Sequence, residues 1–428
     1  MCLQAIGEAG SDPLEAEAHQ LAAEMSMLSG DIAHAIEHAR RAAELAERAG
    51  ETAMLIESLG TLCHYETYTG PITPGLLERA VELERAAPRP SNNYSPREIL
   101  GLRLMYADRL DEARELLEER LDWTAEIGDE LDRNSLLIHL TQLECRAGRP
   151  SRAAQHAKEG LTISEQTGGW ALAAPLFAVS LAAAHLGDVP AAREAGETGL
   201  SIAESGGSGV FRVLNQWALG FLALSLGDAP GADRRLHELP GELEAMGYRN
   251  PGVRPVYPDA IEARITSGDL AVEPLIDQLE GCGRALDNPW ARAAAARCRG
   301  LLLASRGDTE GAIGELERAL VEQERSPQPL ERGRTLLELG AAQRRGKRKR
   351  DARTSLQEAL DAFEGIGAAL WAERARKELG LPEARGPLPH RARVEARALT
   401  KQTSGVPGFL GGPGKSGVIE VGRREAQP

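Results

Sequence analysis

The chain has 428 residues, of which 42% are apolar and 27% are charged, but only 4% are aromatic. The formal net charge of −14 excludes a nucleic-acid platform spread over the whole surface, because such platforms gather lysine and arginine. The scarcity of aromatic rings argues against one large core and favours a thinner core of alanine and leucine, as solenoid proteins have.

The cysteines and the hydropathy pattern indicate a cytoplasmic protein that does not enter membranes. The cysteines are odd in number and form no CxxC motif, so we expect reduced structural thiols rather than a disulfide framework. The N-terminus has no cationic start followed by an apolar segment, and no stretch approaches the roughly 18 uninterrupted apolar residues of a membrane span. The cysteines are Cys2, Cys63, Cys145, Cys282 and Cys298.

The first predicted helix spans residues 12–28, because Pro13 directly after Asp12 is typical of a helix start. It ends at the turn sequence LSGDIAHA. Related turns, among them HLGDVPAA, SLGDAPGA and SRGDTEGA, recur at intervals of 38 to 41 residues, which indicates a repeat protein. The nine turn residues are Gly30, Gly70, Asp108, Gly148, Gly187, Gly227, Gly268, Gly307 and Lys347.

The segment after each turn has helical spacing and two fixed features. Five residues after the turn, eight of nine positions hold a small residue, which suits a close crossing of two helices; the exception is Glu273. These small residues are Ala35, Gly75, Ala113, Ala153, Ala192, Ala232, Ala312 and Ala352. Twenty residues after the turn stands a residue type that ends helices, at Gly50, Pro90, Gly128, Gly168, Gly207, Gly247, Asn288, Pro327 and Gly367.

A second helix, such as GVFRVLNQWALGFLALSL, lies between each of these stops and the next turn. It often carries a glycine seven residues before the turn, at Gly101, Gly220, Gly300 and Gly340. Because a glycine inside a helix costs roughly 1 kcal/mol relative to alanine, we expect a close helix contact at this offset. No alternating strand pattern competes. The sequence predicts an all-α fold of nine helix pairs over about residues 10–368, followed by a capping helix over residues 368–380.

The pattern around each turn resembles the tetratricopeptide repeat (TPR). It consists of a glycine seven residues before the turn, the turn residue itself and an alanine five residues later. In three repeats a further alanine follows twelve residues after the turn, at Ala42, Ala319 and Ala359. The period of about 40 residues is similar to the lengthened repeats of large bacterial regulators. Residues 289–320 (PWARAAAARCRGLLLASRGDTEGAIGELERAL) and 331–380 resemble the segment that precedes the DNA-binding domain of large ATP-binding LuxR-type transcriptional regulators. This resemblance implies a right-handed superhelix that serves as the sensor region.

Regulators of that type also carry a P-loop ATPase before the repeats and a helix-turn-helix domain after them. The sequence contains no GxxxxGK[ST] motif, and ARALTKQ (residues 396–402), which resembles the lead-in to the DNA-binding domain, is followed by no helical pattern. Residues 381–428 hold eight glycines and six prolines, with eight Lys/Arg against four Asp/Glu. We therefore expect a repeat array over residues 1–380 and a disordered basic tail over 381–428, in a truncated or frame-shifted regulator or a relative without effector domains.

In TPR-like arrays the helix before the turn lines a concave groove. By analogy, the side chains that face this groove stand thirteen, ten, six and three residues before the turn residue. Three rings from adjacent repeats, Phe177, Trp217 and Phe221, would then form an exposed apolar patch rimmed by charge. The alternative is that longer helices wind more tightly and bury these rings as core. The groove residues predicted to bind are Met105, Gln142, Phe177, Trp217, Phe221, Glu262 and Arg297.

Three local motifs have simpler explanations than the chemistry they suggest. Residues 34–38 (HAIEH) match the HxxEH pattern of zinc proteases, but other repeats hold mostly charged, solvated residues at the two histidine positions. GGPGKSG (residues 411–417) resembles a P-loop, but Phe409 stands where glycine is required. The basic run over residues 344–350 is either a phosphate-contacting patch or a solvated turn. We expect no metal and no cofactor.

No nucleophile with its base and no paired carboxylates can be assembled from the sequence, so we expect no enzyme. The favoured hypothesis is a cytoplasmic sensor region of a LuxR-family regulator, which binds a protein partner or a small inducer in its concave groove. Such a chain would bind neither nucleic acid nor membranes directly. The alternative is a free-standing TPR adaptor that holds two proteins together.

Overall fold

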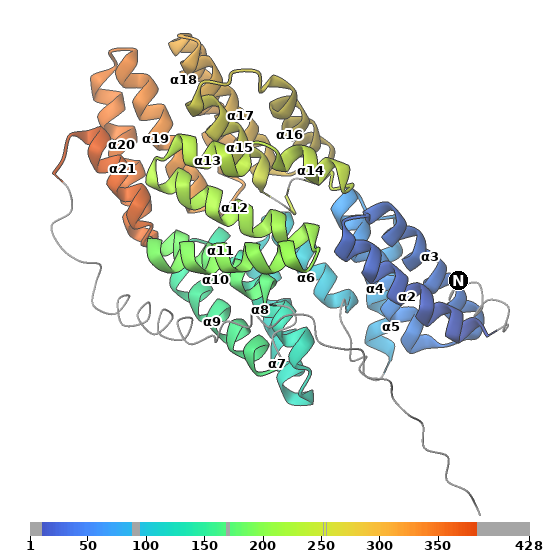
Figure 1. The fold of residues 1–428 in the computed structure, drawn as a ribbon. Coiled ribbons are helices and arrows are strands. Elements are labelled where there is room, and N and C mark those ends of the chain that lie inside the picture. The colour runs from blue at the N-terminus through green and yellow to red at the C-terminus, as the bar shows by residue number, and fades with distance from the viewer. Residues whose placement is uncertain (1–10, 88–94, 168–171, 251, 254, 383–428) are drawn as a thin grey trace, which may run out of the picture.

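The computed structural model describes residues 11–87, 95–167, 172–250, 252–253 and 255–382 (Figure 1). These residues form α-helices joined by turns and loops, without a β-strand, as the sequence predicts. Most of the expected tail, residues 383–428, lies outside the described part. In Figure 1 the last repeats, α16 to α21, lie at the end of the molecule opposite to α7 and α9.

The helices alternate along the chain between two classes, which we name by their position relative to the turn residues. The pre-turn helices are α2 (Asp12–Ser29), α4 (Thr52–Thr69), α6 (Pro96–Tyr106), α8 (Glu130–Arg146), α10 (Ala173–Leu186), α12 (Gly209–Leu226), α15 (Val256–Ser267), α17 (Pro289–Ser305) and α19 (Pro329–Arg345). The post-turn helices are α3 (Ile32–Ala49), α5 (Leu76–Ala86), α7 (Leu110–Ile127), α9 (Pro150–Gln166), α11 (Val189–Ser205), α13 (Ala229–Leu236) with α14 (Leu239–Ala245), α16 (Glu273–Ala285), α18 (Thr309–Gln323) and α20 (Lys349–Ile366). The last helix, α21 (Ala369–Leu379), matches the predicted capping helix.

The nine predicted turn residues share one backbone feature: each has a positive φ. Seven are glycines, for which this conformation carries no steric cost from a Cβ atom. Asp108 and Lys347 adopt it without being glycine, with φ of 63° and 61°. The repeat period is therefore a property of the backbone as well as of the sequence.

The predicted helix ends are confirmed in some repeats and not in others. Five of the predicted stop glycines, such as Gly50 and Gly367, do have positive φ after a post-turn helix. Asn288 instead begins a helix, because its side-chain oxygen accepts a hydrogen bond from the backbone N–H of Ala291. Pro327 lies in the loop between α18 and α19. The predicted stops at residues 90 and 168 lie outside the described residues.

The sixth post-turn helix differs from its predicted form. The helical spacing between the turn at Gly227 and the stop at Gly247 predicts one helix, but the structure has two short helices, α13 and α14, with a break at His237 and Glu238. Pro240 follows the break at the start of α14, where its missing N–H leaves no hydrogen bond unmade. The proline therefore interrupts the helix without ending the repeat.

The helical glycines seven residues before the turn mark close contacts, as expected. A Cβ atom added to any of Gly101, Gly220, Gly300 or Gly340 would crowd a leucine of the post-turn helix in the same repeat. At Gly340 the added atom would lie 2.5 Å from Leu356 Cγ and 3.1 Å from the backbone oxygen of Ala352. The glycine thus sets how closely α19 approaches α20.

We predict opposite effects for two glycine-to-alanine substitutions within helices. Gly340→Ala should lower the free energy of unfolding by about 1–3 kcal/mol, because the backbone of Ala352 leaves the new methyl no room. Gly314→Ala, at a helical position with no neighbouring atom within 4 Å, should raise it by roughly 0.5–1 kcal/mol. Urea unfolding of both variants measures the difference. Equal effects would contradict the close contact.

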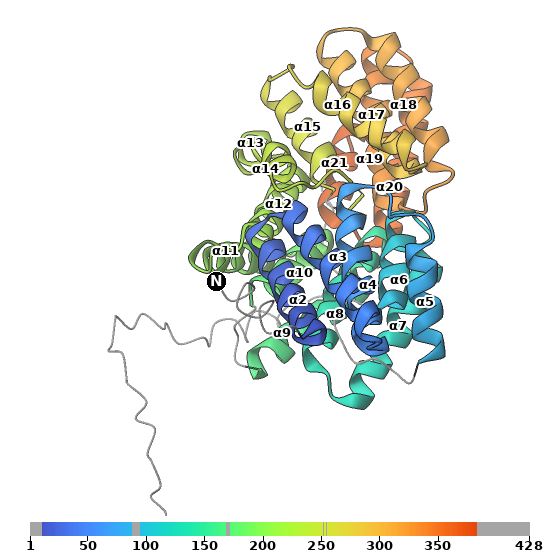
Figure 2. The same ribbon diagram turned by 90° about the vertical axis from the view of Figure 1, so that its right-hand side faces the viewer.

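The superhelix winds so tightly that successive turns touch. Across the seam between turns, Asn250 donates to the backbone oxygen of Thr67 at 3.1 Å, and Asn288 donates to that of Tyr106 at 2.6 Å. Gln328 donates to Asp108 Oδ1 at 2.6 Å. These partners are 182 to 220 residues apart, so about five repeats complete one superhelical turn. Figure 2 shows the early and late helices gathered into one body rather than drawn out along an axis.

Helix α12 is long and apolar enough to cross a membrane by length and composition alone, and it is the one such helix in the described residues. Most of this helix is buried inside the protein, between α10, α11 and α13. A core helix passes the same test of length and composition, so α12 is explained by its place in the core.

Candidate functional site

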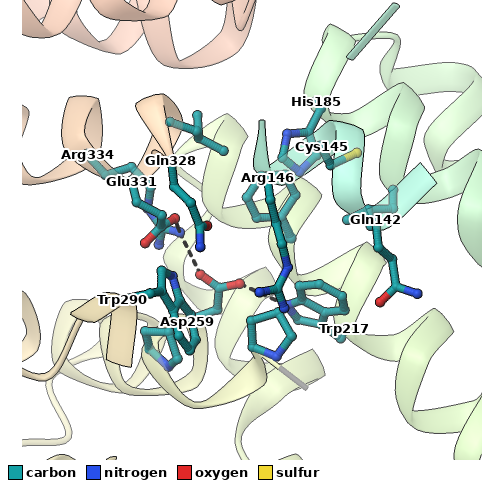
Figure 3. Close-up of a pocket in the computed structure, with 15 residues that line it drawn as sticks. Gln142, Cys145, Arg146, His185, Trp217, Asp259, Trp290, Gln328, Glu331 and Arg334 are labelled. Carbon is teal, nitrogen blue, oxygen red and sulfur yellow. Dashed lines mark hydrogen bonds and ion pairs between the residues drawn. The ribbon is translucent and has the colours of Figure 1, made fainter. Parts of the chain in front are cut away.

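Side chains from six consecutive pre-turn helices, α8, α10, α12, α15, α17 and α19, converge on one pocket at the centre of the superhelix (Figure 3). We call it the inner pocket. Among the described residues, only pre-turn helices and the loops before them line the inner pocket. This agrees with the prediction that these helices face inward. The side chains that characterise it are Gln142, Arg146, His185, Trp217, Phe221, Asp259, Trp290, Gln328, Glu331 and Arg334.

The predicted groove residues are all buried. None of the seven side chains is more than 6% exposed, so the expected exposed aromatic patch is wrong. The alternative, that the rings form core, is confirmed by Phe177 and Trp217, whose ring centroids lie 5.9 Å apart in the main hydrophobic cluster. The cause is the tight winding, which brings opposite walls of the groove together. The structure brings Gln142, Trp217 and Phe221 to the inner pocket, whereas Met105, Phe177, Glu262 and Arg297 lie outside its lining.

A buried cluster of charges forms one wall of the inner pocket. Its centre is Arg334 on α19, which is 2% exposed. The guanidinium contacts three carboxylates, at 2.8 Å to Asp259, 2.6 Å to Glu262 and 3.0 Å to Glu331. Because Asp259 and Glu262 lie on α15, the cluster joins helices two repeats apart.

Burial and neighbouring charges act in opposite directions on these groups. Burial alone would raise the pKa of Glu331, but Arg297 at 2.6 Å and Arg334 lower it to about 2. Burial likewise opposes the charge of Arg334, yet its carboxylate partners hold its pKa well above the usual value. For Asp259 burial prevails over Arg334 and raises the pKa. The carboxylates of the cluster therefore differ in how readily they take up a proton.

Two aromatic rings contact the charge cluster. The indole N–H of Trp217 donates to Asp259 Oδ2 at 2.8 Å. Trp371, on the capping helix α21, lies under the guanidinium of Arg334, 4.9 Å from its ring centroid. On the same helix, Arg374 donates to the backbone oxygen of Leu224 on α12 at 3.0 Å. Helix α21 thus links the last repeat to the sixth across the seam.

The size of the inner pocket restricts what it can hold. Its volume is about 60 Å³, room for a few water molecules or one side chain. A pocket for a drug-sized molecule has roughly 300–1,000 Å³. In this conformation, the inner pocket suits a single inserted side chain better than a whole metabolite.

The chemistry of the lining favours binding over catalysis. Burial lowers the pKa of His185 to about 4, so its imidazole is neutral near pH 7. Burial also raises the pKa of the Cys145 thiol, which keeps it from forming the nucleophilic thiolate. Asp259 and Glu331 are both held by Arg334. The pocket therefore presents an aromatic surface next to polar groups whose positions are fixed by ion pairs.

A second cluster has the residue types of a metal site. Glu118, Glu144 and His156 bring their ligand atoms within 4.8 Å of one another. Arg152 contacts both carboxylates, and Arg114 donates to Glu144 at 2.7 Å. These two guanidinium groups already balance the negative charge that would attract a cation. At the HxxEH segment, His38 contacts His19, 2.8 Å between Nδ1 atoms, whereas His34 pairs with Asp31.

The sequence-based prediction missed the centre of the site. Arg334 stands thirteen residues before Lys347, one of the groove offsets, so the offset rule extended to the last repeat would have found it. Asp259, nine residues before Gly268, falls outside these offsets and had no local signal. Trp371 follows the last turn of the array and was expected only as part of a cap.

No protein-family model and no curated protein matches this chain. Among solved structures, it resembles the Rap protein crystallised in complex with Competence and Sporulation Factor, with a TM-score of 0.62 at 11% identity over 82% of this chain and 98% of that one. The APC/C hetero-tetramer Cut9–Hcn1 gives a TM-score of 0.40 at 10% identity, over 87% and 77% of the two chains. The likeness to the Rap protein shows a TPR-like helical repeat fold.

Proposed function

We propose that the chain is a cytoplasmic, non-enzymatic binding repeat that takes a peptide or a segment of a partner protein on its inner face. The observation that carries this proposal is the inner pocket, in which six consecutive repeats present aromatic and polar side chains to one small cavity. The Rap protein, which has a similar fold, was crystallised with Competence and Sporulation Factor. An inserted side chain would anchor the partner, and the surrounding repeats would contact its backbone.

Binding at the inner pocket would act through the pitch of the superhelix. The seam contacts of Gln328 with Asp108 and of Arg374 with Leu224 fix how closely successive turns approach. A ligand that separates the pocket walls would favour a wider arrangement in which these contacts are broken. Because α21 crosses the seam, its position would then report whether the pocket is occupied.

A regulator role is the first form of this proposal, supported by this mechanism and by the LuxR-type resemblance of residues 289–320 and 331–380. In that role the array would sense a partner or small inducer and pass its state to effector domains. The free-standing adaptor is the alternative, and the coding sequence upstream of residue 1 separates them. An in-frame P-loop ATPase there would support the regulator, whereas its absence together with a stable two-protein complex would support the adaptor.

Peptides selected from a displayed random library against the full chain test the inner pocket. Leu181 lines the pocket, so Leu181→Phe should fill it and weaken the selected peptides by at least about tenfold. Leu226→Phe makes the same change at a half-exposed position of α12 outside the pocket and should leave binding unchanged. Thermal unfolding of both variants checks that they are folded. Equal binding to the two folded variants would refute the proposed site.

We predict no direct DNA binding by this chain. In the basic run at the last turn, Arg344 pairs with Glu378 and Arg348 with Glu310, which offsets part of the charge available to phosphates. A gel-shift assay with duplex DNA should therefore show no complex at about 150 mM salt. A complex that weakens steeply as salt rises would contradict this prediction.

A further inference from the structure

The outer side of α2 carries an exposed apolar stripe. Of the nine large apolar side chains exposed in the described residues, four lie on this one helix. They are Leu14, Leu21, Met25 and Leu28, with Leu21 at 63% and Met25 at 66% exposure. The spacings of seven, four and three residues place them on one face, in the pattern of a coiled-coil seam. We call these four residues the α2 stripe.

The offset of Met25 is buried elsewhere in the array. Met25 stands five residues before its turn residue, and seven of the eight equivalent side chains are buried: Tyr65, Leu143, Ala182, Leu222, Ala263, Leu302 and Ala342. The other pre-turn helices each contact the post-turn helix of the repeat before, as α10 contacts α9 and α12 contacts α11. Helix α2 has no such helix before it in the described part of the chain. At Met25 the α2 stripe therefore continues the repeat-to-repeat contact surface of the array, and no described helix covers it there.

The charges around the α2 stripe limit what can cover it. Helix α2 contains four carboxylates and no lysine or arginine. Asp12 and Glu15 are paired with arginines of α3, but Glu17 and Glu24 have no ion-pair partner among the described residues. Burial raises the pKa of Glu24, and the nearby carboxylate of Glu57 adds to this shift. A second acidic surface, including a second copy of α2, would be repelled.

We propose that the α2 stripe is the docking site of an amphipathic helix from a partner protein, with apolar residues at heptad spacing and lysine or arginine beside them. The partner helix would occupy the place that a preceding post-turn helix takes at the other repeats. Its apolar side chains would cover Leu21 and Met25, and its basic residues would pair with Glu17 and Glu24. This surface is separate from the inner pocket, so the array would hold two partners at different places.

Fluorescence anisotropy with synthetic helices as long as α2 tests the proposal on the full chain. One probe carries a leucine heptad stripe flanked by lysines, the second has the lysines replaced by glutamates, and the third scrambles the first. We expect only the lysine-flanked helix to bind. Leu21→Lys should weaken it by at least about tenfold, whereas Val321→Lys, at an equally exposed apolar residue on α18, should not. Glu17→Lys should weaken the lysine-flanked helix and admit the glutamate-flanked one.

Each other outcome overturns the proposal. Because Leu21 is 63% exposed, Leu21→Lys should leave the melting temperature unchanged, so lost binding would not reflect lost folding. Two results would exclude a specific basic partner helix. One is binding that survives Leu21→Lys, and the other is equal binding of the lysine-flanked, glutamate-flanked and scrambled helices. A dimer in sedimentation velocity that Leu21→Lys converts to a monomer would assign the stripe to a second copy. Binding seen only after removal of residues 1–10 would assign it to the chain's own N-terminus.

Discussion

Replacing Trp217 by alanine should lower the free energy of unfolding by about 3–5 kcal/mol. The side chain is 6% exposed, packs against Phe177 and donates its indole N–H to the buried carboxylate of Asp259. Removing it leaves a cavity between adjacent repeats and a carboxylate oxygen without its indole donor. Chemical denaturation followed by circular dichroism measures the loss.

Two controls separate these contributions. Trp217→Phe keeps most of the apolar volume but loses the N–H donor, so it should cost about 1–3 kcal/mol, less than alanine. Val321→Ala, which removes methyl groups at an exposed position, should change stability by less than about 0.5 kcal/mol. If Trp217→Ala also cost under about 1 kcal/mol, the ring would not be part of the core and the groove interpretation would return.

Replacing Arg334 by methionine should destabilise the protein by about 3–5 kcal/mol near pH 7. The arginine is the shared partner of Asp259, Glu262 and Glu331, and its removal leaves these carboxylates buried together without their common cation. Arg325→Met is the matched control, because Arg325 pairs with Asp287 in an exposed position and should cost less than about 1 kcal/mol. A similar effect of both variants would contradict the central role of Arg334.

The effect of Arg334→Met should also depend on pH. The folded-state pKa of Glu331 is about 2, below its ordinary value of 4.5, so this group stabilises the fold above about pH 4.5 and loses that contribution as the pH falls towards 2. Without Arg334 the pKa of Glu331 is lowered less, because Arg297 is then the one arginine of this cluster that still pairs with it. The stability difference between wild type and variant should therefore be largest at neutral pH and narrow below about pH 4.5. A difference that stays constant or grows with acid would contradict this assignment.

The sequence predicted the local architecture because the repeat signals are local. Gly30 and Gly187 mark turns whose backbone requires positive φ, and Gly340 marks a helix contact within one repeat. Each signal concerns residues in one helix pair; the turn recurs nine times and the helix glycine four times, so chance agreement is excluded. The break between α13 and α14 was missed, although Pro240 was visible, because the strong period around it favoured an unbroken helix.

The site was predicted less well than the repeats, because its geometry depends on the rotation between successive repeats. A small rotation between neighbouring repeats, accumulated over about five of them, decides whether Gln328 reaches Asp108. No single repeat contains that information. For the same reason, Glu262 and Arg297 were expected beside an exposed aromatic patch in an open groove, whereas the structure buries them in ion pairs with Arg334 and Glu331.

Successive turns of the superhelix touch, and this contact buries its inner face. Spin labels at Arg109 and Pro327, on a variant in which Cys2 and Cys282 are replaced by serine, test it most directly by electron–electron double resonance. These residues are 218 positions apart (327 − 109) but line the same groove at the seam. We predict one short, narrow distance. A long and broad distribution would show an open solenoid, in which the inner pocket would have lost its opposite walls.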